Sequence, residues 1–520
     1  MFSTALIKPN TVPEWLFIEY VLCALPILWL LGTRIYNLFF HKLASLPGPI
    51  AYRASGLPYV YKLITGQWPH TLKALHEEYG PIVRYSPNDV SFISAQAWNE
   101  IYGHGKPNKP TMSKDLRLYR ETLTESKNIL IANDADHSRM RRLLSHAFSE
   151  KALRGQEDIL RSHIDKLISS LGTRADEQGE TAVVDLCLWY NLLTFDVLGD
   201  LAFGEPFGCL DSGDYHPWVA IIFDGFKLSS YVQSLRRYPR AFHILKFLLP
   251  HDLIARQQVH QRQSFDKVKM RVELGAKPDD PNARKDFLSY VLRHNDERGM
   301  TADEMGENAN ILITAGSETT ATALTATTYW LLRNPAVYQK LVNEIRSRFA
   351  TEADIDAQSV CQIDYLLAAL KEGLRMHPPV PSGLARQVPK GGASICDNWI
   401  AEDTKVSVSH YVAYSSTLNF TLPDQFIPER WLDTTPFAND ATEVFQPFSY
   451  GPRNCIGMNL AHIEMRIALA RVLWNYDLEL QPASQSWHKQ KIYIFWEKPA
   501  LLVRVIRRKN LVQRTKTPSS

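Results

Sequence analysis

The stretch that decides the fold is Phe448-Ser449-Tyr450-Gly451-Pro452-Arg453-Asn454-Cys455-Ile456-Gly457. It contains one cysteine, and a helix-like run over residues 460–473 follows it. Gly451 can supply a turn with positive φ, and Gly457 leaves room for a flat cofactor to approach the backbone. The positive end of the following helix favours a thiolate at Cys455, and Arg453 is a permanent cation suited to a carboxylate on the cofactor. These features are those of a metal-ligating loop.

The same stretch resembles the haem-binding loop of the cytochrome P450 family, whose pattern is Phe-x-x-Gly-x-Arg-x-Cys-x-Gly. The positions that match are Phe448, Gly451, Arg453, Cys455 and Gly457, whereas Ser449 stands where many members have glycine. The resemblance implies that Cys455 is the axial thiolate ligand of a haem b, and that Phe448, Arg453 and Gly457 contact that haem. A free cysteine is more often a buried structural residue, which we expect for Cys23, Cys187, Cys209, Cys361 and Cys396.

Bulk composition excludes several other classes of protein. The chain has 520 residues, of which 45% are hydrophobic and 22% charged, as in ordinary globular proteins. The net charge is only +3, from 58 basic and 55 acidic residues, which argues against a nucleic-acid-binding protein. Six cysteines without regular spacing form neither a disulfide framework nor a zinc site.

The N-terminus predicts a single membrane anchor. Residues 15–32 are mostly apolar, with Glu19 and Pro26 inside the run, and this length is near the lower limit for a membrane-spanning helix. Arg34 and Lys42 follow, which places the bulk of the chain on the cytoplasmic side. The alternative is an interfacial or buried helix. Family members bound to the endoplasmic reticulum membrane have a similar anchor and a proline-rich hinge, here at residues 46–49.

The pattern beyond the hinge predicts a mainly α fold with a smaller β-sheet region. A helix is expected at 68–79, a hairpin at 82–85 and 90–93, and mainly helices from there to about residue 380. Strands are expected at 383–388 and 400–412, and residues 487–505 are expected to return to the same sheet. We therefore divide the chain into an anchor and linker (1–44), one catalytic domain (45–510) and a disordered tail (511–520). The resemblance places the haem between a long central helix and the cysteine loop.

That long helix is expected at 301–332, because Thr301 and Glu304 form a capping box and Asn334-Pro335 ends the run. Its middle reads Ala315-Gly316-Ser317-Glu318-Thr319-Thr320. This is similar to the family's Ala/Gly-Gly-x-Asp/Glu-Thr-Thr motif, which implies that Ala315 borders the haem and that Glu318 and Thr319 deliver protons to O₂. A groove for O₂ and substrate would explain the glycine inside the helix. Hydroxyl groups that bond back to the helix backbone are the alternative interpretation.

Two further groups of residues gain a role from the resemblance. His137 and Arg141 share a helix face, and the family has a similar pair that reaches the haem propionates; Arg386 is a second expected propionate partner. Arg139 and Arg142 are expected to form a solvated face. Glu372 and Arg375 resemble the Glu-x-x-Arg pair of the family, and Arg430 completes this structural triad. Trp431 stands where phenylalanine is often found, a difference that we expect to affect packing volume only.

The sequence therefore predicts a haem-thiolate monooxygenase that inserts one atom of O₂ into a C–H bond of a lipophilic small molecule. The resemblance is to fungal members that modify secondary metabolites, which implies a polyketide or terpenoid substrate, contacted from 103–131, 214–250 and 380–384. It also implies NADPH-cytochrome P450 reductase and membrane lipid as partners and a monomeric catalytic unit. Two alternatives are a reductase-independent haem-thiolate isomerase or dehydratase, and a non-catalytic haem-binding membrane protein.

Overall fold

The computed structural model describes residues 14–105, 111–117, 119, 126–238, 266, 268–271, 273, 275, 286–296, 299–432 and 435–508. For 14–22, 217–224, 226 and 435 it describes the backbone only. The expected tail at 511–520 lies outside the described residues, as do parts of the substrate-contacting stretches 103–131 and 214–250.

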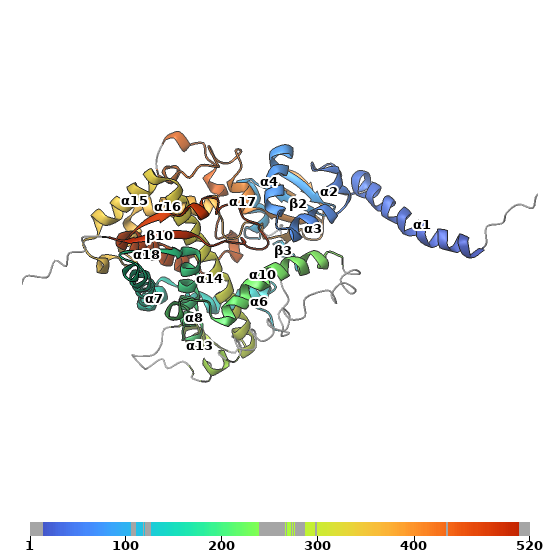
Figure 1. Ribbon diagram of the computed structural model, residues 1–520. Coiled ribbons are helices and arrows are strands. Elements are labelled where there is room, and N and C mark those ends of the chain that lie inside the picture. The colour runs from blue at the N-terminus through green and yellow to red at the C-terminus, as the bar shows by residue number, and fades with distance from the viewer. Residues whose placement is uncertain are drawn as a thin grey trace, which may run out of the picture.

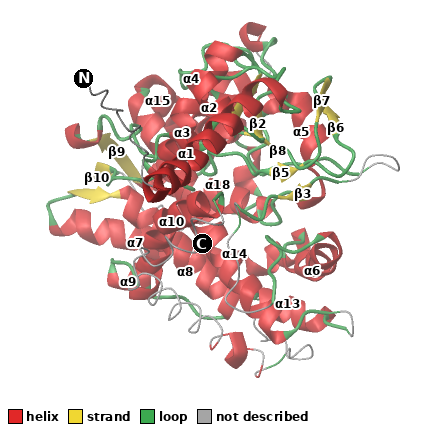
Figure 2. Ribbon diagram, turned by 90° about the vertical axis from the view of Figure 1, so that its right-hand side faces the viewer, coloured by secondary structure: helices red, strands yellow, loops and turns green. Residues whose placement is uncertain are grey.

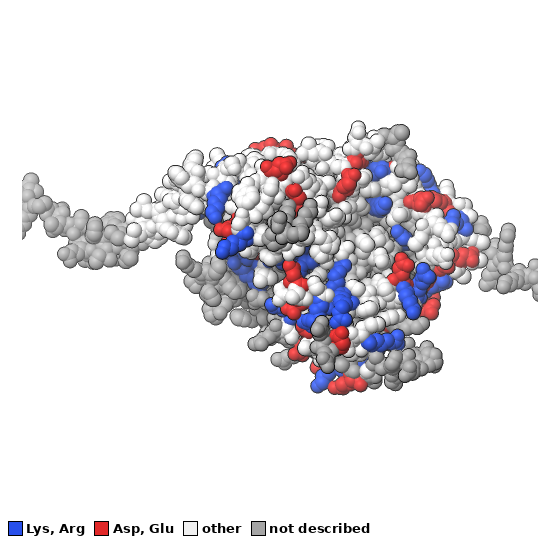
Figure 3. All heavy atoms as spheres, turned by 180° about the vertical axis from the view of Figure 1, so that it is seen from behind, with Lys and Arg blue, Asp and Glu red and all other residues white. Residues whose placement is uncertain are grey.

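Helix α1 (Glu14–Ile35) confirms the helix expected at 15–32 and projects from the body of the protein as a rod (Figure 1). A π-helical turn, Tyr36–Phe40, follows it. Leu25, Leu28 and Trp29 of α1 are exposed, and Figure 3 shows the described side chains of this rod, from residue 23 on, as almost all uncharged. Residues 23–40 are long and apolar enough to cross a membrane. An exposed apolar surface of this kind fits contact with lipid.

An N-terminal segment and a later segment, residues 386–414, together form the region around a five-stranded sheet with the strand order β1-β2-β8-β5-β3. Strands β1 (Ile82–Ser86) and β2 (Asp89–Phe92) pair antiparallel, which confirms the expected hairpin, and α4 confirms the helix at 68–79. The other elements of this region are α2 (Ile50–Ala54), α3 (Leu57–Ile64), α4 (Trp68–Tyr79), α5 (Ala95–Tyr102), β3 (Ser113–Lys114), β5 (Arg386–Gln387), β8 (Lys405–Val408) and α17 (His410–Tyr414).

The rest of the domain is a helical body with its own, larger hydrophobic core. Its helices are α6 (Asp134–Ala147), α7 (Glu150–Glu177), α8 (Leu186–Phe203), α9 (Cys209–Ser212), α10 (Pro217–Arg236), α13 (Phe287–His294), α14 (Ala302–Arg333), α15 (Pro335–Arg348), α16 (Asp364–Met376) and α18 (Met458–Asn475). The central helix α14 packs against α8, α16 and α18. Its length and its Thr301–Glu304 capping box confirm the helix expected at 301–332, and the apolar helix α8 is buried in the core.

Two expectations about strands are wrong. Residues 400–412 are not one strand, because the positive φ of Asp403 turns the chain between β7 (Asn398–Ile400) and β8, and α17 begins at His410. β7 pairs with β6 (Ala393–Ile395) in a separate two-stranded sheet. Strand β10 (Leu502–Arg507) does not return to the five-stranded sheet; it pairs with β4 (Thr181–Asp185) and β9 (Tyr476–Leu480). Figure 2 shows β9 and β10 on the opposite side of the view from β2, β8, β5 and β3 of the five-stranded sheet.

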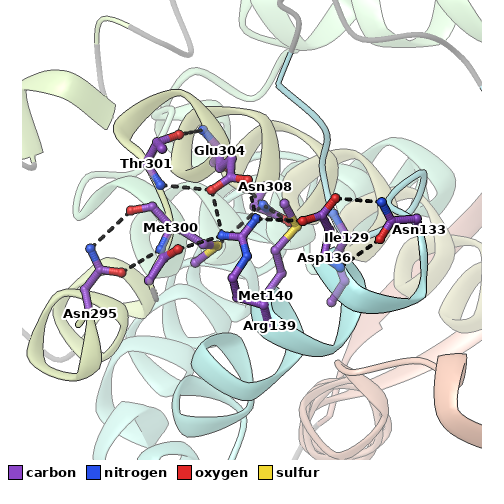
Figure 4. Close-up of polar contacts among 11 residues, drawn as sticks. Ile129, Asn133, Asp136, Arg139, Met140, Asn295, Met300, Thr301, Glu304 and Asn308 are labelled. Atoms are coloured by element: carbon purple, nitrogen blue, oxygen red, sulfur yellow. Dashed lines mark hydrogen bonds and ion pairs between the residues drawn. The ribbon is translucent and has the colours of Figure 1, made fainter. Parts of the chain in front are cut away.

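Arg139 corrects the expectation of a solvated basic face on α6. Its guanidinium bonds both carboxylate oxygens of Glu304, at 2.9 and 2.6 Å, and so ties α6 to the N-terminus of α14 (Figure 4). Beside it, the buried Asn308 accepts a hydrogen bond from the backbone N–H of Ile129 at 2.9 Å. The segment before α6 is therefore fixed to α14, while Arg142 forms the exposed pair with Asp296 that a solvated face requires.

The cysteines divide into two groups. Cys187 and Cys209 are buried as expected, and Cys396 is half-buried. Cys23 and Cys361 are exposed, so the expectation of a buried structural cysteine is wrong for these two.

A buried ion network connects α16 to the segment before the cysteine loop. Glu372 accepts from Arg375 at 2.8 and 2.9 Å and from Arg430 at 3.1 Å, and all three side chains are fully buried. The indole N–H of Trp431 also donates to Glu372, at 2.9 Å. The expectation that Trp431 affects packing volume only is therefore wrong, since phenylalanine has no donor to offer here.

The network reaches the cysteine loop through one tyrosine. Arg375 donates to the backbone carbonyl of Tyr414 at 2.9 Å, and the hydroxyl of Tyr414 accepts from the backbone N–H of Gln446 at 2.8 Å. Gln446 in turn accepts the N–H of Ser449 at 2.9 Å. We therefore infer that the triad supports the scaffold of the loop.

Replacing Glu372 by alanine should be strongly destabilising, because the buried Arg375 would lose its carboxylate and Arg430 would keep only that of Asp440. We expect Glu372→Ala to lower the free energy of unfolding by about 3–5 kcal/mol, as for other broken buried ion pairs, and urea denaturation measures it. The matched control is Glu479→Ala, which removes the exposed pair between Glu479 and Arg504 and should cost at most about 1 kcal/mol. Equal losses in the two variants would contradict a structural role for the triad.

Candidate active site

The cysteine loop presents a thiol at the start of α18. Gly451 has φ +75°, and a Cβ there would collide with the backbone carbonyl of Tyr102, so this turn requires glycine. The backbone N–H of Cys455 donates to the carbonyl of Phe448 at 2.8 Å, and Gly457 is the N-cap residue of α18. The Cys455 side chain is exposed. The loop thus holds its own backbone rigidly and leaves the sulfur accessible.

The surroundings of the sulfur disfavour a bare thiolate. Although Cys455 is exposed, desolvation by the protein around it raises the pKa of the thiol. The backbone N–H of Gly457 and the Arg141 guanidinium lower this pKa but offset only part of the rise. The donors expected from the sequence are therefore present, yet the thiolate needs a further positive partner, which a coordinated metal ion supplies.

Basic side chains from four separate segments gather beside this loop in what we call the cationic cluster. They are Lys114, His137, Arg141, Arg386 and Arg453, and they act on one another's pKa. Burial together with Arg386 and Arg453 holds the pKa of Lys114 well below its usual value. Burial, Arg453 and Lys114 lower that of His137 to about 4. The carboxylate that counters these cations is Asp134, which is paired with Arg453 at 2.7 Å.

Two guanidinium groups of this cluster each have a buried nitrogen without a hydrogen-bond partner among the described residues. Arg386 makes one long hydrogen bond, to the carbonyl of Met112 at 3.4 Å, and its buried Nε has no partner among the described residues. Arg453 bonds Asp134 and the carbonyl of Ala132, while its buried Nη1 has no partner in the described part of the chain. Buried donors of this kind are normally satisfied, so the geometry calls for an acceptor between them.

Arg141 and Phe448 are held by the loop region itself. Arg141 donates to the backbone and side-chain oxygens of Asn454, at 2.7 and 2.6 Å, so it fixes the residue next to the cysteine. The ring of Phe448 packs against that of His462 of α18, with ring centroids 4.8 Å apart. A Cβ on Gly457 would meet only ordinary contacts, at 3.8 Å from Phe148 and 4.0 Å from the Cys455 sulfur. The protein alone does not require glycine at 457.

These residues fit a haem. An excess of cations with unpaired buried donors suits two propionate groups, an accessible thiol suits an iron ligand, and a glycine that the protein does not need leaves space for a flat ring beside the sulfur. Lys114 was not anticipated from the sequence. It stands 272 positions before Arg386 in the chain, and only the pairing of β3 with β5 brings them together.

The middle of α14 has an accessible strip on an otherwise buried helix. Ala315 is exposed and Thr319, one turn later, is half-exposed, whereas Ser317, Glu318 and Thr320 are buried. The Thr319 hydroxyl donates to the carbonyl of Ala315 at 2.6 Å. Gly316 lies on another side, where a Cβ would stand 2.7 Å from Leu198 of α8. Close packing of α14 on α8 therefore accounts for this glycine, in place of the groove expected from the sequence.

Glu318 is paired with a lysine rather than with Thr319. Its side chain is buried, and Oε1 lies 2.7 Å from Nζ of Lys498 and 3.3 Å from the hydroxyl of Thr322. Burial raises the pKa of Glu318, and Lys498 counters that rise. The partner was missed in the sequence, because Lys498 carries no local signal of a role and lies 180 positions further along the chain.

Comparison with known proteins agrees with this geometry. The family model for cytochrome P450 matches residues 54–502. Cytochrome P450 monooxygenase astJ of Aspergillus oryzae is 43% identical over 92% of this chain and 95% of its own. Cytochrome P450 monooxygenase astA of Talaromyces wortmannii is 44% identical over 93% and 96%. A trichothecene C-4 hydroxylase of Trichoderma arundinaceum is 42% identical over 91% and 93%. The similarity thus extends over both the five-stranded sheet and the helical body.

Ser449 holds an unfavourable backbone conformation in the cysteine loop. It has φ +61°, a conformation that costs a non-glycine residue about 1–2 kcal/mol, and its buried hydroxyl has no partner among the described residues. We expect Ser449→Gly to raise the free energy of unfolding by about 0.5–1 kcal/mol after the extra entropy of the unfolded glycine is subtracted, as measured by urea denaturation. As a control, Ser347→Gly in the exposed part of α15 should lower it by about 0.5 kcal/mol. A loss of stability in Ser449→Gly would show that the serine makes a favourable contact.

Proposed function

Because this chain belongs to the cytochrome P450 family, it is a haem-thiolate oxidoreductase, and we propose that it inserts one atom of O₂ into a C–H bond of a lipophilic metabolite. The observation that carries this proposal is the accessible Ala315–Thr319 strip on the buried helix α14, in a chain whose accessible Cys455 lies beside the cationic cluster. When bound, the haem supplies the binding and activation of O₂. The residues of the chain hold it, move protons and position the substrate.

Binding of the cofactor is assigned as follows. Cys455 would ligate the haem iron through its thiolate, and Ala315, Phe448 and Gly457 would contact the ring. The propionates are assigned to the cationic cluster, Lys114, His137, Arg141, Arg386 and Arg453. The buried and unpaired Nε of Arg386 and Nη1 of Arg453 are the donors best suited to them, since charge-assisted hydrogen bonds to a carboxylate are the strong ones.

Proton delivery is assigned to Glu318 and Thr319. Oε2 of Glu318 is buried and has no partner among the described residues, so this oxygen can carry a proton without breaking an existing bond. The hydroxyl of Thr319 donates to Ala315 and keeps its lone pairs free to accept. A proton would leave Oε2 for the Thr319 oxygen, while the Thr319 hydroxyl gives up its hydrogen bond to the Ala315 carbonyl and passes its own proton to the oxygen being reduced. Water would then reprotonate Glu318.

The substrate class and the partners follow from the relatives and from α1. One relative is named a trichothecene C-4 hydroxylase, and we extend this to a fungal secondary metabolite with a terpenoid or polyketide skeleton. A redox partner is required by the reaction, and we assign NADPH-cytochrome P450 reductase. The exposed apolar side chains of α1, such as Leu28 and Trp29, support a single anchor in the endoplasmic reticulum membrane, with a monomeric catalytic domain on its cytosolic side.

The test of the proposal is turnover of a terpenoid and polyketide panel by membranes that contain the full chain and the reductase. We expect a compound that shifts the haem spin state to gain one oxygen atom only when NADPH and O₂ are present. Turnover without NADPH would favour an isomerase or dehydratase. A complete lack of spin shifts across the panel would favour a non-catalytic haem protein.

Thr319→Ala should uncouple NADPH consumption from product formation. Loss of the hydroxyl removes one proton carrier, and we expect product per NADPH to fall on the order of tenfold, with a matching rise in released peroxide. Thr325→Ala is the matched control, because Thr325 makes the same bond to a carbonyl four residues back, at 2.7 Å, in the buried part of α14. If the control and Thr319→Ala uncouple equally, Thr319 has no special role.

A further inference from the structure

The buried ion pair between Lys498 and Glu318 has a closed and asymmetric geometry. Nζ of Lys498 lies 2.7 Å from Oε1 of Glu318 and donates to the hydroxyl of Thr322 at 2.8 Å. The same hydroxyl donates to Oε1 at 3.3 Å. Only 4% of the lysine side chain and 2% of the glutamate side chain are exposed. Both donors therefore meet one oxygen of the carboxylate, and Oε2 is left buried without a partner among the described residues.

Lys498 is held in place from both sides along the chain. Two positions before it, the indole N–H of Trp496 donates to the carbonyl of Pro378 at 2.8 Å, and the Trp496 ring stacks on His377 with centroids 3.7 Å apart. One position after it, the carbonyl of Pro499 accepts from the indole of Trp487 at 2.9 Å. The backbone that carries the ammonium group is thus fixed, so the lysine reaches Glu318 from a prepared position.

This geometry controls which oxygen of Glu318 can act. A carboxyl group buried without a cation would remain protonated, and its proton could then reside on either oxygen. The ammonium group removes that equivalence by binding Oε1 together with Thr322. Glu318 thereby keeps a fixed orientation, and Oε2 stays available for proton exchange.

We propose that Lys498 is a positioning residue for proton delivery, which binds Oε1 of Glu318 and leaves Oε2 as the oxygen that exchanges protons with Thr319. This inference rests on the proposed function, since it needs Glu318 to deliver protons. It adds to that function a residue from the segment between β9 and β10, far from the α14 motif in the sequence.

The pH dependence of peroxide release tests the Glu318–Lys498 pair, because three titratable groups that interact with it have pKa values far from neutrality. Glu318 interacts electrostatically with Cys187 and Tyr215, and Lys498 interacts with His377. Burial raises the pKa of Cys187 to about 12 and raises that of Tyr215 strongly, whereas burial and Lys498 hold that of His377 well below its usual value. A change in the profile between about pH 6 and 8 is therefore not due to titration of Cys187, Tyr215 or His377.

The experiment compares Lys498→Met, Lys498→Arg, Glu318→Gln and the double variant Glu318→Gln/Lys498→Met in the haem-loaded full chain with reductase. The probe is the panel compound that gives the largest spin shift, and the readout is peroxide released per NADPH from pH 6 to 8. We expect Lys498→Met to raise this ratio several-fold and alter its pH profile, Lys498→Arg to restore both, and the double variant to match Glu318→Gln alone. In the thermal midpoint, Lys498→Met should lose on the order of 5 °C, and the double variant should recover most of that loss.

Glu497→Gln is the matched control. Glu497 is the adjacent residue, and it pairs with Lys227 of α10 at 3.5 Å with both side chains about half exposed (48% each). We expect the peroxide ratio and the midpoint of this variant to equal those of the wild type. If Lys498→Met fails to fold, Thr322→Val is measured in its place, because it removes the second donor to Oε1 of Glu318. A raised peroxide ratio in Thr322→Val supports the proposal, and an unchanged ratio overturns it.

The outcomes distinguish proton delivery by Glu318 from its positioning by Lys498. If Glu318→Gln raises the peroxide ratio and Lys498→Met does not, the proposed function stands and the role of Lys498 is overturned. Additive effects of the two substitutions also overturn it, because they show that the residues act independently. If Glu318→Gln itself leaves the peroxide ratio unchanged, Glu318 does not deliver protons, and the role proposed for Lys498 is overturned as well.

Discussion

A carboxylate cannot be buried without partners except at a cost of several kcal/mol, and this constraint shapes both the scaffold and the site. Glu372 meets it completely: both oxygens accept from Arg375, Arg430, Trp431 and a backbone N–H. Only one oxygen of Glu318 has partners, Lys498 and Thr322, and the other oxygen has none among the described residues. A carboxylate that is bonded on every side fixes structure, whereas one with a free oxygen can still move a proton.

The same reasoning explains the surroundings of Cys455. The protein gathers Lys114, His137, Arg141, Arg386 and Arg453 beside a thiol whose pKa it raises. Asp134 neutralises only part of this positive charge, and Arg141 offsets only part of the rise in the thiol pKa. A haem resolves both imbalances at once, since its propionates carry negative charge and its iron binds the thiolate. The arrangement is therefore an electrostatic complement to one particular cofactor, and the buried network of Glu372 connects it to the fold.

Local chemistry made much of this predictable from the sequence. Capping at Thr301, the proline after Asn334 and the glycine at 451 each determine a backbone conformation within a few residues, and the helices at 68–79 and 301–332 were predicted nearly to the residue. The features that the sequence did not predict are contacts between residues that lie far apart along the chain. Lys498 and Lys114 have no signal of their own, Arg139 binds Glu304 165 positions away, and β10 pairs with a strand, β4, that lies in a region expected to be helical.

The measurement that tests the central claim most directly is the absorption spectrum of the reduced, carbon monoxide-bound protein. For the wild type the account predicts the strongly red-shifted Soret band of a thiolate-ligated haem. In Cys455→Ala, expressed and loaded in the same way, that band should be absent, because the sulfur that ligates the iron is gone. A red-shifted band that persists in Cys455→Ala would contradict the account, since the ligand would then be a residue other than Cys455.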